Sequence, residues 1–362
     1  MSNPEKRLVF CISPHGFGHA AQTSSVVNHL IATRPELEIW IKTSLSEAFI
    51  KERFHPTVKI FPNIIDFGML MASSIDVLAE DSWLRYKALH DHWDANIEKE
   101  MAELQQINPD LVVSNIAYVS LEAAHRLNIP SIAMSSLNWA DIFEAYCNDF
   151  SGAESIIEQM RQSYDKASTF VQFTPCPPMN WLNNKSPVSP ITRLGNRKRQ
   201  EINTQLQLNE KTKLVLIGLG GIEMRLSIET WPIAPNTLYI VPDEWQTQQE
   251  NCIPLSVLQL PFIDILASVD GVITKPGYGT FSEAVCNQTP FVYVLRGDWP
   301  EEPFLEKFAK DFGNALSVTR DELNRGLFLD QFDAMMQNPD ETKAPPKALG
   351  HEETVEIILN NL

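Results

Sequence analysis

Residues 275–308, KPGYGTFSEAVCNQTPFVYVLRGDWPEEPFLEKF, carry the pattern that decides the fold of this chain. A short apolar run at 271–274 precedes them and predicts a β-strand, which leads into a turn containing Gly277 and Gly279. A helical pattern follows the turn, and a second apolar strand is expected at 290–295. A strand, a glycine-rich turn, a helix and a further strand form the repeating unit of an α/β fold with a parallel sheet.

The turn and helix of this segment predict a binding site for a nucleotide sugar. We expect the helix to begin at Thr280 or Ser282, to carry Glu283 in its first turn and to end near Asn287. Backbone N–H groups at a helix N-terminus bind phosphate, because they lack partners within the helix and the helix dipole favours negative charge there. A carboxylate one turn further on is placed to bind ribose hydroxyls, and the acidic pair after the next strand to bind sugar hydroxyls. The predicted donor-binding residues of this segment are Lys275, Gly277, Tyr278, Gly279, Thr280, Glu283, Glu301 and Glu302.

Apolar runs of strand length alternate with amphipathic stretches along the whole chain, which predicts an α/β fold with parallel sheets. The expected strands lie at 8–13, 38–43, 58–61, 110–114, 131–135, 170–173, 213–217, 238–241, 257–260, 271–274, 291–295 and 315–318, and the longest helical pattern runs from 82 to 106. Five prolines fall within 174–190, so no regular element is expected there.

A chain of 362 residues exceeds one ordinary core, so we predict two facing Rossmann-like domains with a cleft between them. The predicted division is an N-terminal domain at 1–173, a linker at 174–200, a C-terminal nucleotide-sugar-binding domain at 201–342 and a terminal helical segment at 343–362. Ligands of open α/β sheets lie beyond the carboxyl ends of the strands, where all three glycine-rich loops of this chain are expected.

Composition narrows the possible partners and compartment. The net charge of −17 is spread evenly over both halves, which argues against nucleic acid and anionic membranes as partners. The five cysteines form no CxxC pair, which favours a reducing compartment and no zinc site. The first residues lead directly into a strand and no apolar run approaches the ~20 residues of a membrane span. We therefore expect a cytoplasmic protein.

The first strand leads into the loop SPHGFGHAAQ at 13–22, which reads G-x-G-x-x-A through Gly16, Gly18 and Ala21. This is the relaxed form of a dinucleotide-binding pattern, and Gly18 is a further candidate for donor binding. A dehydrogenase would also need an acidic residue at the end of the second strand to bind the ribose. The chain has Lys-Thr-Ser at 42–44, which argues against that class.

Two histidines in the same loop are candidates for chemistry. His19 is expected at the helix N-terminus, whose positive end disfavours imidazolium, so that the ring would be neutral and able to accept a proton. We predict that His19 is the catalytic residue and that His15 contacts the acceptor. The alternative is that these rings only cap or pack the first turn of the helix.

A second glycine-rich loop, LIGLGGIEMR at 216–225, follows the first strand of the second half. Gly220 and Gly221 would let the backbone approach a diphosphate, with Arg225 as a charge partner, although a plain tight turn explains them equally well. Lys275 could likewise reach a phosphate or simply cap a strand end. No GxxxxGK[ST] pattern occurs, which argues against a P-loop nucleotide hydrolase or kinase.

The stretch MSSLNWADIFEAY at 134–146 places three further candidates just after a predicted strand. Asn138, Trp139 and Asp141 are acceptor-side candidates, since an aromatic ring there can stack on a sugar or can instead fill the core. No D-x-D pair occurs, and the acids do not cluster with histidines at metal-ligand spacing. We therefore expect neither a metal nor a cofactor.

These motifs resemble those of the nucleotide-sugar glycosyltransferases with the GT-B fold. KPGYGTFSEA, the strand after it and EEPFLEKF are similar to the donor-binding segment of UDP-glycosyltransferases. HGFGHA, PDLVVSN, SLNWADIFEAY and KPGYGTFSEA…EEPF also resemble the glycosyltransferase-like N-terminal domain of L-arabinokinases. The resemblance spans roughly residues 8 to 320, and the terminal helix resembles a tail that crosses back to the first domain.

The resemblance implies roles for individual residues. The family's general base falls on His19, its ribose-binding glutamate on Glu283 and its diphosphate turn on 277–280, while its sugar-binding acidic pair falls near 301–302. Many members have histidine where this chain has Lys275.

The expected function is metal-independent transfer of a sugar from a UDP-sugar to an acceptor of unknown identity, with inversion implied by the resemblance. A catalytically silent sugar-nucleotide binding module and a nucleotide-sugar 2-epimerase are the alternatives. A binding module would not consume the donor, and a 2-epimerase would consume it without an acceptor. A transferase needs an acceptor.

Overall fold

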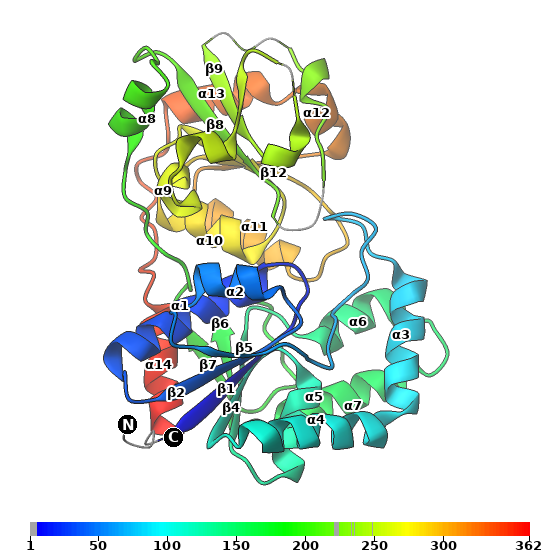
Figure 1. The fold of residues 1–362 in the computed structure, drawn as a ribbon. Coiled ribbons are helices and arrows are strands. Elements are labelled where there is room, and N and C mark those ends of the chain that lie inside the picture. Colours follow the sequence, from blue (N-terminus) through cyan, green and yellow to red (C-terminus); the bar gives the residue numbers. More distant parts are fainter. Residues whose placement is uncertain (1–5, 221–223, 233, 235, 248) are drawn as a thin grey trace.

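A computed structural model describes residues 6–220, 224–232, 234, 236–247 and 249–362, and it contains two parallel β-sheets flanked by helices (Figure 1). The strand order is β3-β2-β1-β4-β5-β6-β7 in the first sheet and β10-β9-β8-β11-β12-β13 in the second. The chain thus has the predicted fold class, two facing α/β domains. Among the described residues, we find no helix with the length and apolar character that crossing a membrane requires.

The first sheet occupies the lower half of Figure 1. Its strands are β1 (Arg7–Ile12), β2 (Glu38–Lys42), β3 (Lys59–Phe61), β4 (Leu111–Asn115), β5 (Ser131–Ser135), β6 (Thr169–Phe173) and β7 (Lys185–Val188). Its helices are α1 (Gly18–Thr33), α2 (Glu47–Arg53), α3 (Ala79–Asp91), α4 (Trp93–Ile107), α5 (Tyr118–Arg126), α6 (Trp139–Cys147), α7 (Ala153–Asp165) and, from the far end of the chain, α14 (Gly350–Asn360). Strands β4, β5 and β6 are buried along their whole length, as expected for the centre of a parallel sheet covered on both faces.

The second sheet occupies the upper half. Its strands are β8 (Lys213–Gly218), β9 (Thr237–Val241), β10 (Cys252–Pro254), β11 (Gly271–Thr274), β12 (Phe291–Val294) and β13 (Ala315–Val318). The helices of this half are α8 (Arg199–Gln205), α9 (Phe262–Leu266), α10 (Tyr278–Cys286), α11 (Glu302–Phe312), α12 (Arg320–Arg325) and α13 (Leu329–Gln337).

Three local predictions were wrong. The strand expected at 257–260 is instead the end of a 3₁₀ turn, Leu255–Leu258, followed by Gln259 in the left-handed region at φ 50°. A stretch of four residues with three apolar side chains fits one helical turn as well as a strand. The helical pattern at 82–106 is two helices, because the backbone leaves the helical region at His92.

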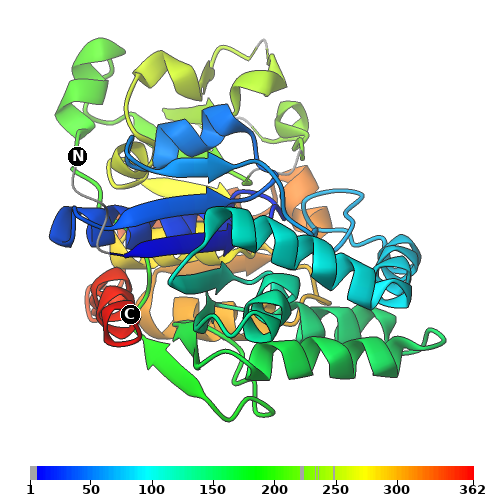
Figure 2. The same cartoon turned by 60° about the horizontal axis from the view of Figure 1, so that its bottom comes forward.

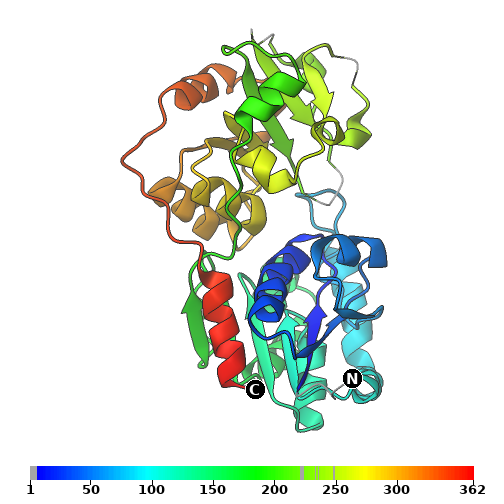
Figure 3. The same cartoon turned by 60° about the vertical axis from the view of Figure 1, so that its left-hand side comes forward.

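The third error concerns the proline-rich segment 174–190, which contains the regular strand β7. This strand pairs only with β6 and therefore lies at the edge of the sheet, where Pro187 can be accommodated on the side without a neighbour. Helix α14 contacts β7 and α1, so the end of the chain lies against the first sheet (Figures 2 and 3). Its Glu353 accepts hydrogen bonds from the backbone N–H and the hydroxyl of Ser189, at 2.6 and 2.8 Å.

The end of β2 carries a buried charge cluster. The ammonium group of Lys42 lies 2.9 Å from Glu100 and 2.8 Å from Glu103, and it donates to the carbonyl of Asn63 at 3.1 Å. The side chains of Lys42 and Glu100 are completely buried. A cation thus occupies the place where a dehydrogenase would hold the acid that binds ribose.

Removing this cation should destabilise the first domain. In Lys42→Met two carboxylates lose their buried counter-charge, so the free energy of unfolding in urea should fall by about 3–5 kcal/mol. Lys51→Met is the matched control, because Lys51 pairs with Glu47 at 2.7 Å on the surface, where ion pairs contribute little. Equal unfolding midpoints for the two variants would contradict this account of the cluster.

Candidate functional site

A cavity of about 420 Å³ lies between the two domains, at the carboxyl ends of strands from both sheets. Its wall includes eleven of the predicted site residues, namely His15, Gly18, His19, Gly220, Lys275, Gly277, Tyr278, Gly279, Thr280, Glu283 and Glu301. Four others, Asn138, Trp139, Asp141 and Glu302, are not part of the wall. Gly221 lies outside the described residues.

His19 lies in the first turn of α1 and is held in one orientation. Its Nδ1 is 2.9 Å from Oδ1 of Asn115 at the end of β4, and its ring meets the ring of Trp139 edge-on at 5.5 Å. Burial lowers the pKa of His19 to about 4, and the Asn115 hydrogen bond acts in the opposite direction. The lowered pKa supports the neutral ring that we expected for His19, although burial is the main cause of the shift.

The hydrogen bonds of Asn115 fix which ring nitrogen of His19 carries the proton. The Nδ2 group of Asn115 lies 3.1–3.2 Å from the carbonyl of His19, Oε1 of Gln22 and the hydroxyl of Thr23. Because Thr23 donates its own proton to the His19 carbonyl, its oxygen accepts from Asn115. The amide oxygen of Asn115 must then face His19, so Nδ1 of the ring donates and Nε2 has a free lone pair.

The same network continues across the cavity to the second domain. Nε2 of Gln22 donates to Ser136 at 3.3 Å, and the Ser136 hydroxyl donates to Oε1 of Glu301 at 2.7 Å. Ser136 follows β5 in the first domain, whereas Glu301 precedes α11 in the second. Four hydrogen bonds thus connect His19, through Asn115, Gln22 and Ser136, to Glu301.

The opposite wall of the cavity is the start of α10. This helix begins at Tyr278 with Gly277 as its N-cap, and no side chain caps it. Its first N–H groups are thus available to a ligand. A Cβ atom at Gly279 would meet no atom within 4 Å, so glycine leaves open space there. The earlier start also corrects the position of Glu283, which lies in the second turn of the helix rather than the first.

Lys275 lies directly before this helix, against the second glycine-rich loop. A Cβ atom at Gly220, where φ is 80°, would lie 3.4 Å from Cε of Lys275. Burial lowers the pKa of Lys275 to about 8, with repulsion from Arg296 as a further cause, while Glu301 opposes both. Within the described part of the chain, no hydrogen bond or ion pair holds this ammonium group, which suits it to a ligand anion.

Glu301 and Glu302 have different surroundings. Glu301 is buried in the cavity wall, where it accepts from Ser136 and, at 3.4 Å, from Nε1 of Trp299; burial raises its pKa to about 7. Glu302 accepts from the backbone N–H groups of Arg296 and Gly297, at 3.0 and 3.2 Å, and stabilises that turn. Glu302 thus holds this turn and lies outside the cavity wall, so its predicted contact with the sugar gains no support from the geometry.

Glu283 also lies in the wall, as a partly buried carboxylate. Burial raises its pKa to about 7, while Arg193 and Arg53 act to lower it.

Tyr278 has a structural role, because its hydroxyl is hydrogen-bonded within the chain. Its hydroxyl accepts from the N–H of Ile191 at 2.8 Å and donates to the carbonyl of Thr174 at 3.0 Å, and so connects α10 to the end of β6 and to the segment that follows β7.

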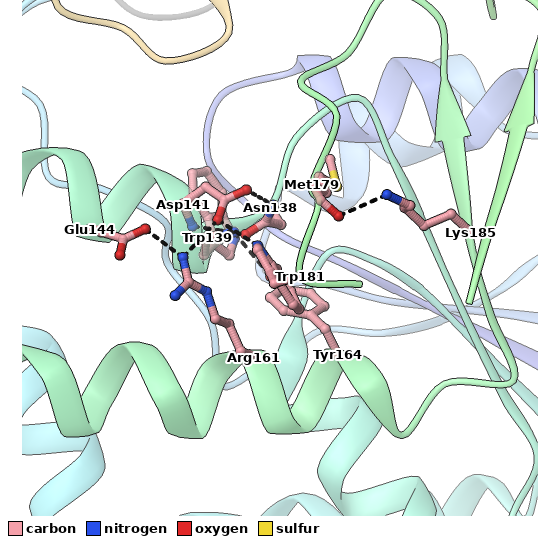
Figure 4. A network of polar contacts seen from close by, with 9 residues as sticks. All are labelled: Asn138, Trp139, Asp141, Glu144, Arg161, Tyr164, Met179, Trp181 and Lys185. Carbon is pink, nitrogen blue, oxygen red and sulfur yellow. Dashed lines mark hydrogen bonds and ion pairs between the residues drawn. The ribbon is translucent and has the colours of Figure 1, made fainter. Parts of the chain in front are cut away.

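The acceptor-side candidates on α6 form a structural network (Figure 4). Asn138 caps α6 by accepting from the N–H of Asp141 at 2.9 Å, and Asp141 accepts from Nε1 of Trp181 at 2.7 Å. Trp139 is fully buried and donates to Asp66 at 3.2 Å. Trp139 thus fills the core, the second of the two roles expected for it, and it supports the rings of both His15 and His19, while Asn138 and Asp141 cap and brace α6.

Several wall residues were not predicted. Gln22 lies on α1, Ser136 directly after β5, Arg53 at the end of α2 and Arg296 after β12, and Asn115, which holds His19 from the end of β4, was not predicted either. Arg225 was a candidate but pairs with Glu229 outside the wall. Among the described residues no group of three or more His, Cys, Asp or Glu side chains could hold a metal ion.

Comparison with known proteins places the fold. No family model matches the chain. It is 27% identical over 334 residues to L-arabinokinase of Arabidopsis thaliana, an alignment that covers 90% of this chain and 32% of that protein. The chain thus spans about a third of the length of this curated relative.

Solved structures are similar over nearly the whole chain. The glycotransferase of kitacinnamycin has a TM-score of 0.65 at 13% identity, with 99% of both chains covered. Arabidopsis thaliana UGT89C1 complexed with UDP has a TM-score of 0.59 at 14% identity, with 98% of this chain and 94% of that chain covered. Since both sheets are aligned in full, the chain has the GT-B fold of these glycosyltransferases.

Proposed function

We propose that this protein transfers a glycosyl group from a nucleoside diphosphate sugar, with a UDP-sugar as the expected donor, to an acceptor hydroxyl without a metal ion. The observation that carries the proposal is the pairing of two features across one cavity. A neutral histidine with a free Nε2 lies on one wall, and an uncapped helix N-terminus beside a partly buried lysine lies on the other. The structures of the same fold include complexes with UDP.

On the donor side, the diphosphate would lie at the start of α10. The free N–H groups at Gly279 and Thr280 and the helix dipole would bind its oxygens, and Lys275 would supply a positive charge. These groups would stabilise the negative charge that develops on the departing diphosphate. Glu283 would accept hydrogen bonds from the ribose hydroxyls, and Glu301 from the transferred sugar.

On the acceptor side, Nε2 of His19 would take the proton of the attacking hydroxyl. The acceptor oxygen forms a bond to the anomeric carbon while the bond from that carbon to the phosphate oxygen breaks, and the electron pair leaves with the diphosphate. Attack opposite the leaving group would invert the configuration. Asn115 keeps Nδ1 protonated and so directs the basic nitrogen to the cavity.

One observation favours a second candidate, a binding module with slow or no turnover. The partner of Nδ1 is the neutral amide of Asn115, which carries no charge to stabilise an imidazolium. A pKa of about 4 makes His19 a weak base at neutral pH. A 2-epimerase, the third possibility, would consume donor without any acceptor.

Nucleotide binding should be independent of metal. UDP in the presence of EDTA should raise the melting temperature, because a ligand that binds only the folded state stabilises it.

In Gly279→Val the added side chain would enter the space at the start of α10, so UDP affinity should fall at least about tenfold. The melting temperature of the ligand-free variant should stay close to wild type. Retained affinity would show that UDP does not bind at this helix.

The affinity for UDP-glucose should depend on pH through Glu283. The side chain, whose pKa is about 7, is a stronger hydrogen-bond acceptor as the carboxylate than as the protonated acid, so affinity should decrease as the pH falls from 7.5 to 6. Calorimetry should show a smaller dependence for Glu283→Gln. In Glu302→Gln the pH dependence should match wild type while stability decreases, since Glu302 holds the 296–297 turn. An unchanged pH dependence in Glu283→Gln would remove Glu283 from the ribose site.

His19→Ala should separate chemistry from binding. Transfer, or slow hydrolysis of the donor where no acceptor is known, should fall by about 10²–10⁴, the usual contribution of a positioned base. UDP affinity should be nearly unchanged, because His19 lies on the opposite wall from α10. His90→Ala is the matched control, a second buried histidine with its pKa lowered to about 4 but outside the cavity. Full turnover by His19→Ala would show that another group is the base.

A further inference from the structure

Three side chains with unpaired polar atoms surround the ring of Trp299, beside the cavity, where burial lowers the pKa of Arg296 while Tyr146 and Asp298 act to raise it. The ring of His15 lies parallel to that of Trp299 at 6.3 Å, and the ring of Tyr146 lies at 6.2 Å. The guanidinium of Arg296 lies over the same indole at 4.2 Å from its centre. His15, Arg296 and Trp299 line the cavity, whereas Tyr146 approaches from α6 of the first domain.

The polar atoms of this cluster are buried and lack hydrogen bonds. Nε and Nη2 of Arg296, the hydroxyl of Tyr146 and Nε2 of His15 have no hydrogen-bond partner in the described structure. The Arg296 side chain is only 3% exposed. Buried polar groups nearly always have partners, so several orphaned atoms around one ring indicate a missing ligand. Arginine and tyrosine donate hydrogen bonds, and the tautomer of His15 can adjust, so the ligand that satisfies them is an acceptor.

The chain also supplies no bonded counter-charge for Arg296 within its described part. The carboxylate of Asp298 lies 4.0 Å from Nε, too far for a hydrogen bond, and is 54% exposed. Glu302 binds the backbone of residues 296 and 297, and Glu301 is bonded to Ser136 and Trp299. A buried guanidinium without an anion is costly, and a ligand anion removes that cost.

We propose that the cluster of Arg296, Tyr146 and His15 binds a carboxylate or phosphate carried by one of the two glycosyl substrates, separate from the donor diphosphate. The inference rests on the proposed function. The diphosphate is expected at the start of α10, whereas Arg296 follows β12 and reaches toward α6 of the first domain, beside Glu301. The planar guanidinium matches the two oxygens of such an anion. The substrate class is therefore an acidic sugar, either as the donor glycosyl group or as the acceptor.

Calorimetry with matched ligands tests the inference. For a donor, UDP-glucuronate should bind at least about tenfold more tightly than UDP-glucose, as expected for charge-assisted hydrogen bonds. For an acceptor, glucuronate or glucose 6-phosphate should bind the UDP-saturated protein, and glucose should bind at least about tenfold more weakly. Tighter binding of the acidic ligand in either the donor or the acceptor titration supports the proposal and identifies which substrate carries the anion.

Variants separate this pocket from the rest of the site. Arg296→Met should abolish the preference for the acidic ligand and leave UDP affinity unchanged, and Tyr146→Phe should reduce that preference. The ligand-free melting temperature of Arg296→Met should not fall, because no bonded anion is lost. Arg85→Met is the matched control, since Arg85 stacks on Phe67 at 4.1 Å outside the cavity.

Two results would overturn the inference while the proposed function stands. One is equal binding of acidic and neutral ligands in both arms, and the other is an Arg296→Met protein that loses affinity for UDP itself, which would assign Arg296 to the diphosphate. Failure of every uridine nucleotide to bind the wild type would instead reject the proposed function, and this inference with it.

Discussion

The hydrogen bond between Nδ1 of His19 and the amide oxygen of Asn115 is the interaction on which the rest of the site depends. It determines which ring nitrogen is basic, and it is itself determined by the three acceptors around the Asn115 amide nitrogen. Gln22 and Ser136 extend the network to Glu301, so the orientation of a side chain in the first domain is coupled to a carboxylate of the second. The two walls of the cavity are therefore held in register by side chains as well as by the segments that cross between the domains.

The second constraint is electrostatic. The chain carries a net charge of −17, yet its interdomain cavity contains Arg53, Lys275 and Arg296. Lys275 lies near the uncapped start of α10, and Arg296 lies near the first domain. Because the Arg296 side chain is buried and Lys275 is partly buried, an anionic ligand gains more from them than it would in water. The lowered pKa of Lys275 and the raised pKa values of Glu283 and Glu301 have the same cause, since burial disfavours the charged form of each.

The sequence alone was sufficient to predict the fold class and the site residues that act through their backbone geometry. Gly277, the helix that begins after it and contains Gly279, and the strand at 291–294 were recognised because turn chemistry and apolar periodicity are local properties. The sequence could not show which role a residue has where that role depends on tertiary contacts. Glu301 and Glu302 are adjacent, and only the path of the chain before α11 decides which faces the cavity. From the sequence, Trp139 could equally be a stacking platform or a core residue, and the role of Asn115 depends on His19, which is 96 positions away.

The most direct test of this account is a long-range ¹H–¹⁵N NMR spectrum of the His19 ring, assigned by comparison with His19→Ala and recorded from pH 7.5 to 4.5 in the free and UDP-saturated protein. The account predicts a neutral ring with the proton on Nδ1 throughout most of this range, because burial lowers the pKa of His19 to about 4 and Asn115 accepts from Nδ1. A ring that carries its proton on Nε2, or one that titrates near its ordinary pKa of about 6.5, would contradict it.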